Sequence, residues 1–302
     1  MAAQPTLTIG SRGSQLALWQ AHYIAGQLAE AGFDTRIEII KTTGDHLQTA
    51  SLTQAGGKGL FTKEIEEALL AGHIDLAVHS LKDLPTELPE GLALAAVPLR
   101  ASPFDAIVGE RLAELERGAR VGTSSPRRGA QLRILRPDLR IEPIRGNVDT
   151  RLKKQHSGEF DAILLAAAGL ERLGLGDEIA EVFEPDQICP APGQGALGVQ
   201  TRDHGEALEI CKLLNHESSN QAVRAERSVL AGLGGGCQLP VGAFALVGGD
   251  TMTISGIVVA PDRPLLIRSQ TTGKARNAED LGKWIADDLL WQGAEEMLVP
   301  EK

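Results

Sequence analysis

Cys237 is the residue whose surroundings most suggest covalent chemistry. It follows three consecutive glycines, residues 234–236, at the end of a helix predicted over residues 222–233. Glycine has no Cβ, so this loop could let a bulky group approach and present the thiol as a nucleophile or an attachment point. The alternative is a helix C-cap and turn with a small buried cysteine, which is where cysteines usually lie. The loop alone favours that alternative.

A dense polar cluster follows the strand predicted over residues 74–78. It reads His-Ser-Leu-Lys-Asp-Leu-Pro, from His79 to Pro85. Asp83 could act as a general acid or stabilise a developing cation, and Lys82 could bind a carboxylate. The alternative is a surface turn with a local ion pair, because Pro85 marks a turn. For His79 alone we expect a structural hydrogen bond.

Arginines gather where predicted helices follow predicted strands. Six of them lie in such connections: Arg12, Arg127, Arg128, Arg145, Arg151 and Arg172. In open α/β sheets, ligands bind at the carboxyl ends of strands, near helix N-termini. Taken alone, Arg12 could equally be a solvated turn arginine. The whole set predicts a basic cleft in an acidic protein, and a small ligand bearing many acidic groups.

The stretch Thr-Ser-Ser-Pro-Arg-Arg, residues 123–128, is the clearest anion site among these connections. Serine or threonine at an N-cap with proline in the first turn is a strong helix start. Hydroxyls of Thr123 and Ser125, free backbone N–H groups and two guanidiniums would meet at one positive helix end. Helix capping by itself does not require the double arginine.

Two glycine-rich motifs raise the question of phosphate or nucleotide binding. Lys58 stands among glycines at a predicted helix start and could meet an anion, but the stretch is not a nucleotide P-loop. The second motif, Gly193-x-Gly195-x-x-Gly198, has the spacing of a dinucleotide fingerprint. No predicted strand precedes it and a strand follows it in place of a helix, so we reject the nucleotide interpretation.

Length, charge and cysteine content exclude several classes. The chain has 302 residues and a net charge of −10, which disfavours a general nucleic-acid binder. No run approaches the length of a membrane span, and residues 1–8 do not resemble a secretory signal. The three cysteines form no CxxC pair, so we expect neither a disulfide framework nor a metal site. This usage fits a reducing compartment.

The predicted elements indicate an α/β protein with a distinct C-terminal part. Strands predicted over residues 6–10 and 35–40 flank a helix at 15–31, and the alternation continues to a strand at 197–201. Beyond residue 217 a helix, three meandering strands and a final helix over residues 278–297 form a small α+β domain.

The motifs together resemble the porphobilinogen deaminase (hydroxymethylbilane synthase) family, over roughly residues 7–298. They are Gly-Gly-Lys-Gly-Leu-Phe at 56–61, Val-His-Ser-Leu-Lys-Asp-Leu-Pro at 78–85, Val-Gly-Thr-Ser-Ser-Pro-Arg-Arg at 121–128, Arg-Gly-Asn-Val-Asp-Thr-Arg at 145–151 and Gly-Gly-Cys at 235–237. The resemblance implies two α/β domains similar to periplasmic binding proteins and a small α+β domain that carries the cysteine. The boundaries would be 1–98 with 196–214, 99–195, and 215–302.

The resemblance also implies an activity. Family members are transferases that join four porphobilinogen units head to tail into hydroxymethylbilane and release ammonia at each step. A dipyrromethane cofactor, held by a thioether, primes the chain. The family is cytoplasmic and monomeric, with hand-off of the product to uroporphyrinogen-III synthase as a further implied partnership. No nucleic acid, membrane or metal is implied.

Site residues carried over from the family fall into three groups. Cys237 would hold the cofactor covalently, and Asp83 would be catalytic and also contact the cofactor. The remaining cofactor contacts would be Lys82, Thr123, Ser125, Arg127, Arg128 and Arg151. Substrate or growing chain would contact Arg12, Ser14, Lys58, Arg145, Arg151, Arg172 and Gln194.

One departure from the family and two competing classes complete the interpretation. Gln54 stands where many relatives have a lysine, so a second loop cation is in doubt. A cytoplasmic anion-binding protein of periplasmic-binding-protein type would explain the arginines but would not require Asp83 or a thiol set among glycines. A cysteine hydrolase would need a histidine partner for the thiol, and none lies near Cys237 in the sequence.

Overall fold

The computed structural model describes residues 6–42, 62–235, 239–261 and 263–298. The chain divides into two compact units. Unit 1 comprises residues 1–100 and 196–220, and unit 2 comprises residues 101–195 and 221–302.

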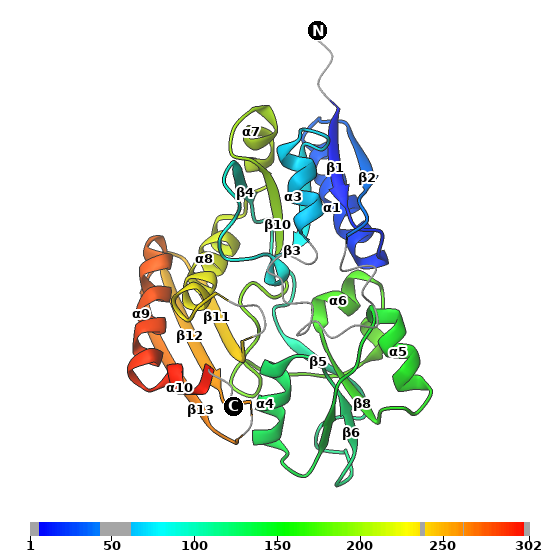
Figure 1. The fold of residues 1–302 in the computed structure, drawn as a ribbon, viewed down its shortest axis with the longest axis vertical. Helices are drawn as coiled ribbons and strands as arrows, with labels where there is room; N and C mark the ends of the chain where they lie inside the picture. Colours follow the sequence, from blue (N-terminus) through cyan, green and yellow to red (C-terminus); the bar gives the residue numbers. More distant parts are fainter. Residues whose placement is uncertain (1–5, 43–61, 236–238, 262, 299–302) are drawn as a thin grey trace. The chain divides into compact units, whose positions relative to one another are not determined.

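Unit 1 is built on a five-stranded mixed sheet in the order β2-β1-β3-β10-β4 (Figure 1). Its strands are β1 (Leu7–Ser11), β2 (Thr35–Ile39), β3 (Leu76–Ser80), β4 (Leu92–Ala96) and β10 (Leu197–Arg202). Its helices are α1 (Gln15–Glu30), α3 (Lys63–Leu70), the 3₁₀ turn η1 (Leu81–Asp83) and α7 (Glu206–Lys212). β1 pairs in parallel with β2 and β3, whereas β10 runs antiparallel to β3 and β4.

The parallel pair β1–β3 positions the polar motifs of unit 1. Ile9 and Gly10 lie opposite Leu76 and Ala77, so both strands end at the same edge of the sheet. β1 is buried along its whole length, as expected for a parallel strand covered on both faces. Its continuation at residues 12–14 and the turn at residues 81–83 therefore start from one edge.

Unit 2 contains a second five-stranded sheet, in the order β7-β6-β8-β5-β9. Its strands are β5 (Asp105–Gly109), β6 (Arg120–Gly122), β7 (Arg140–Glu142), β8 (Ala162–Ala166) and β9 (Ile179–Val182). Its helices are α4 (Pro126–Leu135), α5 (Val148–His156), α6 (Ala167–Arg172) and the 3₁₀ turn η2 (Gly176–Glu178). As in unit 1, four strands run in one direction and one strand, here β5, runs antiparallel to both its neighbours.

The C-terminal part of unit 2 is a three-stranded antiparallel meander with helices against it. Its elements are α8 (Glu217–Gly232, which begins in unit 1), β11 (Val241–Gly248), β12 (Thr251–Val259), β13 (Leu266–Lys274), the 3₁₀ turn η3 (Ala275–Asn277), α9 (Ala278–Trp291) and α10 (Ala294–Leu298).

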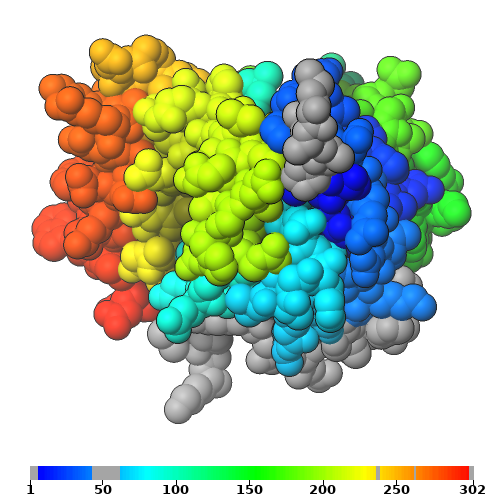
Figure 2. Space-filling view, turned by 90° about the horizontal axis from the view of Figure 1, so that it is seen from above, coloured from blue at the N-terminus to red at the C-terminus, as the bar shows by residue number. Residues whose placement is uncertain are grey.

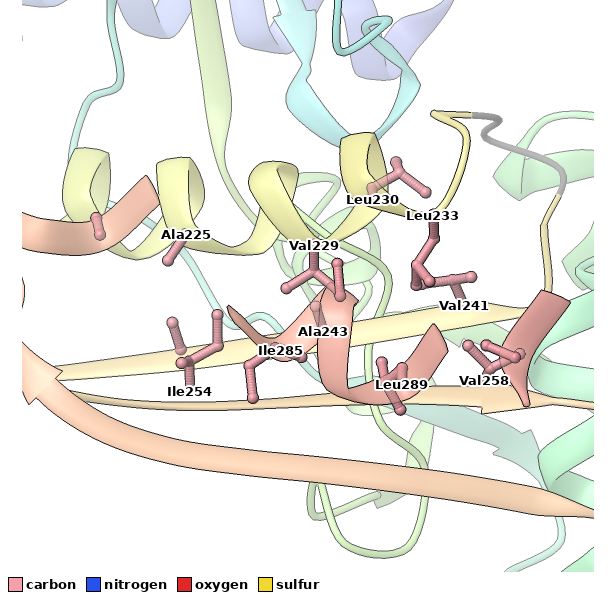
Figure 3. Close-up of a cluster of buried hydrophobic side chains, with 14 of the residues drawn as sticks. Ala225, Val229, Leu230, Leu233, Val241, Ala243, Ile254, Val258, Ile285 and Leu289 are labelled. Atoms are coloured by element: carbon pink, nitrogen blue, oxygen red, sulfur yellow. The ribbon is translucent and has the colours of Figure 1, made fainter. Parts of the chain in front are cut away.

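A dense apolar cluster holds this part together. Figure 3 shows Ala225, Val229 and Leu233, spaced four residues apart, pointing from the α8 segment toward the strands, with Ile285 and Leu289 of α9 in the same cluster. In the space-filling view of Figure 2, the yellow α8 lies directly against the orange α9. A Cβ placed on Gly282 would lie 2.1 Å from the Ala225 carbonyl oxygen, so only glycine allows the two helices this approach.

The structure confirms the predicted fold class, with two mixed α/β sheets and a smaller α+β part. It corrects several elements. β3 continues through Ser80, whereas the prediction ended it at residue 78. The predicted single helix over residues 278–297 is two helices, because Gly293 between them has φ = 96°. The prediction also missed β9 and α7. No helix among the described residues is long and apolar enough to cross a bilayer.

Candidate active site

The shared strand edge of unit 1 carries a small pocket, here called the unit-1 pocket, of about 110 Å³. Three residues predicted from the sequence lie together in its wall, namely Arg12, Ser14 and Asp83. The other polar residues lining it are Gln20, Thr62, His79 and Ser80. The turns that follow β1 and β3 thus bring these three residues together.

Helix α1 fixes one wall of the unit-1 pocket. Ser14 is its N-cap, and the Ser14 hydroxyl accepts a hydrogen bond from the Ala17 N–H at 3.3 Å. One turn further, the buried Gln20 donates from Nε2 to the Ser80 hydroxyl oxygen at 2.7 Å. This bond ties the helix to the end of β3.

Asp83 and Lys82 sit on the short turn η1, whose neighbours anchor it. Leu81 and Leu84 are buried, and the Leu81 N–H donates to the Ala196 carbonyl at 3.0 Å. The intervening side chains therefore point outward, with Asp83 exposed and Lys82 half-buried. A carboxylate held on a rigid, outward-facing turn suits electrostatic stabilisation of a cationic ligand.

Behind the pocket, His79 belongs to a buried chain of polar side chains. Its Nε2 lies 2.8 Å from Gln200 Oε1, and Gln200 Nε2 donates to Glu66 Oε1 at 3.2 Å. Burial lowers the pKa of His79 from 6.5 to about 4; the hydrogen bond to Gln200 opposes this shift and Arg12 adds to it. The expected structural hydrogen bond of His79 is confirmed, and its neutral ring also lines the pocket.

In unit 2, the start of α4 matches the predicted helix cap. The Ser125 hydroxyl accepts from the Arg128 N–H at 3.4 Å, and Pro126 occupies the first turn. Thr123 is buried, and its hydroxyl oxygen accepts from the Ser125 N–H at 3.2 Å. Ser124 donates to the Ile144 carbonyl at 2.6 Å.

The two arginines of α4 have a partner that the sequence did not reveal. Asp105, which is fully buried at the start of β5, binds Arg127 and Arg128, each at 2.6 Å. Gln194 donates to Asp105 Oδ1 at 2.9 Å and to the Pro103 carbonyl at 2.8 Å. We call Asp105, Arg127, Arg128 and Gln194 the Asp105 cluster.

The charge balance of the Asp105 cluster determines its protonation. Burial alone would raise the pKa of Asp105, but Arg127 and Arg128 outweigh this effect and hold that pKa well below its usual value. Arg127 also donates to the Cys189 carbonyl at 2.6 Å. The predicted anion site thus contains an internal anion, and both guanidiniums are almost fully buried.

The other predicted arginines of unit 2 are half-buried, and two are fixed by backbone carbonyls. Arg151 donates from Nε to the Gly146 carbonyl at 2.8 Å, and Arg172 donates to the Gly195 carbonyl at 2.7 Å. Arg145 precedes the α5 N-cap, where the Asn147 side chain accepts from Thr150. Within unit 2, Arg172 and the Asp105 cluster are thus both tied to the segment at residues 194–195.

A further buried carboxylate was also missed. Glu226 of α8 is 0% exposed and accepts from the N–H groups of Gly193, at 2.7 Å, and Ala245, at 2.9 Å. It joins the segment preceding Gln194 to β11 and to the helix that leads toward residue 237. The only available sequence signal was an acidic residue on the apolar side of a helix.

Cys237, Lys58 and Gln54 lie outside the described residues. The helix leading to Cys237 ends as predicted: α8 stops at Gly232, and Gly234 and Gly235 have φ of 99° and 72°. Cys189 and Cys211 are buried, and burial raises the pKa of each to about 12. Within the described ranges, no group of three or more His, Cys, Asp or Glu side chains could hold a metal ion.

Comparisons with known proteins agree over nearly the whole chain. Residues 7–209 match the family model "Porphobilinogen deaminase, dipyromethane cofactor binding domain", and residues 220–291 match "Porphobilinogen deaminase, C-terminal domain". A porphobilinogen deaminase of Roseiflexus is 50% identical, covering 97% of this chain and 99% of its own. That of Geotalea uraniireducens is 46% identical, covering 98% and 95%.

Solved structures give a weaker likeness. A periplasmic substrate-binding protein of an ABC transporter from Coxiella burnetii superposes with a TM-score of 0.44 at 13% identity, covering 69% of this chain and 92% of its own.

Proposed function

Since the chain belongs to the porphobilinogen deaminase family, we propose that it joins four porphobilinogen units head to tail into hydroxymethylbilane and releases ammonia at each step. The observation that carries this proposal is the convergence of Arg12, Ser14 and Asp83 in one pocket of unit 1. Porphobilinogen has an acetate, a propionate and an aminomethyl group. The pocket offers a guanidinium for a carboxylate and a carboxylate for a cation.

Asp83 has the central role in this proposal. Loss of ammonia leaves positive charge on the methylene-pyrrole, and an outward-facing carboxylate in the pocket wall would stabilise that charge. Arg12 and Ser14 would hold an acidic side chain of the incoming ring. Because α1 and η1 are both anchored to buried elements, the geometry of these groups is fixed before the substrate binds.

The described residues fit a covalently attached dipyrromethane. Of the three cysteines, Cys189 and Cys211 are buried with raised pKa values, which disfavours alkylation of either thiol. That leaves Cys237, which follows a helix end with two positive-φ glycines. When bound, the cofactor would supply the pyrrole carbon to which the first substrate unit is joined.

We propose the remaining contacts from the family resemblance. Acetate and propionate groups of the cofactor would meet Lys82, Thr123, Ser125, Arg127, Arg128 and Arg151. The growing chain would meet Lys58, Arg145, Arg151, Arg172 and Gln194. The capped N-terminus of α4 supports this assignment, because its backbone N–H groups and dipole favour anions.

The proposal also covers the setting of the enzyme. It would act as a cytoplasmic monomer of the hydroxymethylbilane-forming transferase class and hand its product to uroporphyrinogen-III synthase. Light scattering of the purified protein would test the monomer, and coupled turnover with that synthase would test the hand-off.

Intact-mass measurement on denatured protein tests the function and the attachment together. We expect an excess over the sequence mass equal to one dipyrromethane, which disappears in Cys237→Ala together with turnover. Cys189→Ala is the matched control and should retain the extra mass. An active protein with the unmodified mass would contradict covalent attachment. A protein that binds small anions but never consumes porphobilinogen would instead be an anion-binding protein.

A further inference from the structure

Thr62 brings an unpaired hydroxyl to the unit-1 pocket. It is only 2% exposed, lines the pocket and precedes α3 as its N-cap residue. Its side chain does not cap the helix, and its Oγ1 has no hydrogen-bond partner among the residues that the structure describes. Buried hydroxyls are normally paired, because desolvation is otherwise uncompensated. Here the missing partner points to a ligand group in the pocket.

His79 offers a second acceptor in the same pocket, because Gln200 fixes its tautomer. A carboxylate oxygen can only accept, so Gln200 must turn Nε2 toward Glu66 and Oε1 toward His79. The neutral ring therefore carries its proton on Nε2 and keeps a lone pair on Nδ1. Within the described part of the chain, Nδ1 makes no hydrogen bond.

These two acceptors share the pocket with the carboxylate of Asp83. A primary ammonium group has three N–H donors, whereas a carboxylate has none and would meet only a lone pair at His79 Nδ1. Arg12, in the same wall, has the complementary preference and suits a carboxylate. The pocket is thus divided into a part for a cationic donor and a part for an anion.

We infer that Thr62 and His79, together with Asp83, form the subsite that binds the primary ammonium group of the substrate. This inference rests on the proposed function. Since the ring of His79 has a pKa of about 4, it accepts a hydrogen bond without removing the proton that makes ammonia a good leaving group. The carbon–nitrogen bond then breaks with both electrons going to nitrogen. Ammonia departs with three hydrogens, and the positive charge remains on the methylene carbon.

Thr62→Val tests the inference on the cofactor-loaded enzyme. Valine keeps the shape and removes a hydroxyl that has no hydrogen-bond partner in the described ranges, so the thermal unfolding midpoint should stay the same or rise. The KM for porphobilinogen should rise about tenfold, the usual effect of losing one hydrogen bond to a charged group. Thr62→Ser, the matched control, should keep the wild-type KM. An unchanged KM in Thr62→Val would overturn the subsite.

A pair of His79 variants separates binding from structure. His79→Gln can keep a donor to Gln200 but has no acceptor at the Nδ1 position, so we expect a nearly wild-type unfolding midpoint and a raised KM. His79→Asn can keep an acceptor near Nδ1 but cannot reach Gln200, so we expect a lower midpoint and a smaller change in KM. The reverse ranking of the two KM values would contradict the assignment.

An analogue in which methyl replaces the aminomethyl group identifies the group recognised. The inhibition constant of this analogue should be the same for Thr62→Val and wild type, because the analogue has no ammonium group to bind the Thr62 hydroxyl. Equal weakening of the analogue and the substrate would overturn the ammonium assignment. If the wild-type protein consumes no porphobilinogen, the proposed function fails; if it does, and Thr62→Val binds it normally, only the subsite fails.

Discussion

The two predicted anion-binding regions differ in how their polar groups are satisfied. In unit 1, the pocket wall carries a buried hydroxyl and an imidazole nitrogen that make no hydrogen bond within the described chain. In unit 2, two guanidiniums share one buried carboxylate, and Gln194 binds the same group. The first region leaves hydrogen-bonding capacity for a ligand, whereas the second has used much of its capacity internally.

This difference suggests that the two regions have different functions. A site that binds and releases a small molecule in every turnover benefits from hydrogen-bond acceptors that are already positioned and not used by the protein. A site that holds a permanent group benefits from rigid cations whose orientation is fixed by the protein. The Asp105 cluster suits the second task, because Asp105, Gln194 and backbone carbonyls together fix the orientation of both guanidiniums. Substitutions in the unit-1 pocket should therefore affect turnover more than folding, and substitutions in the Asp105 cluster should affect folding more than turnover.

The largest effect on folding is expected at Asp105. Asp105→Asn leaves Arg127 and Arg128 buried without a counter-charge, which should lower the free energy of unfolding by about 3–5 kcal/mol. Chemical denaturation followed by circular dichroism measures this change. Asp186, which is exposed and pairs with Arg268 in the same unit, is the control, and Asp186→Asn should change the midpoint little. Equal midpoints for Asp105→Asn and wild type would show that the cluster does not stabilise unit 2.

The next largest expected effect on stability is a pH dependence caused by His79. The folded ring resists protonation down to a pH of about 4, whereas an unfolded histidine takes a proton near 6.5. Stability from this group is thus complete above pH 6.5 and falls as the pH drops toward 4. The slope is at most about 1.4 kcal/mol per pH unit. Unfolding free energies at pH 7, 6 and 5 measure it. His79→Gln should reduce the dependence of the unfolding free energy on pH. An unchanged slope in that variant would show that another group causes the pH dependence.

Glu226 should have a smaller effect on folding. Glu226→Ala leaves the N–H groups of Gly193 and Ala245 unpaired in the interior, at a cost of roughly 2 kcal/mol. Hydrogen exchange should quicken at these two amides first. Glu279, which pairs with Arg224 on the exposed side of the α8–α9 contact, is the matched control. Glu279→Ala should lower stability by less than about 1 kcal/mol. Similar losses for both variants would contradict a special role for the buried carboxylate.

The residues behind these effects show where sequence reasoning succeeds. Ser125 and Pro126 correctly predict the start of α4. The strand β12 has its predicted bounds at Thr251 and Val259. These features depend on neighbours within a few positions. The motif residues Arg12, Ser14 and Asp83 line one pocket, because the parallel strands before them end at one edge of the sheet.

The missed features all depend on partners far away in the sequence. Asp105 lies 22 residues from Arg127, and Gln200 lies 121 residues from His79. No local pattern marks an acidic or amide side chain that will be buried against such a partner. The continuation of β3 through Ser80 has the same cause, because the pairing of Ser80 with Leu197 of β10 is what makes this polar end a strand.

Asp83 should have the smallest effect on folding and the clearest effect on turnover. Its side chain is exposed on a turn held by the buried Leu81 and Leu84, so Asp83→Asn should change the free energy of unfolding by less than about 0.5 kcal/mol. Removing the charge that stabilises a cationic methylene-pyrrole should reduce kcat at least about 100-fold. Glu87→Gln, on the exposed loop that follows, is the charge-matched control and should leave kcat unchanged. Two results would contradict the contrast between the unit-1 pocket and the Asp105 cluster. One is a loss of stability in Asp83→Asn as large as that in Asp105→Asn, and the other is normal turnover in Asp83→Asn.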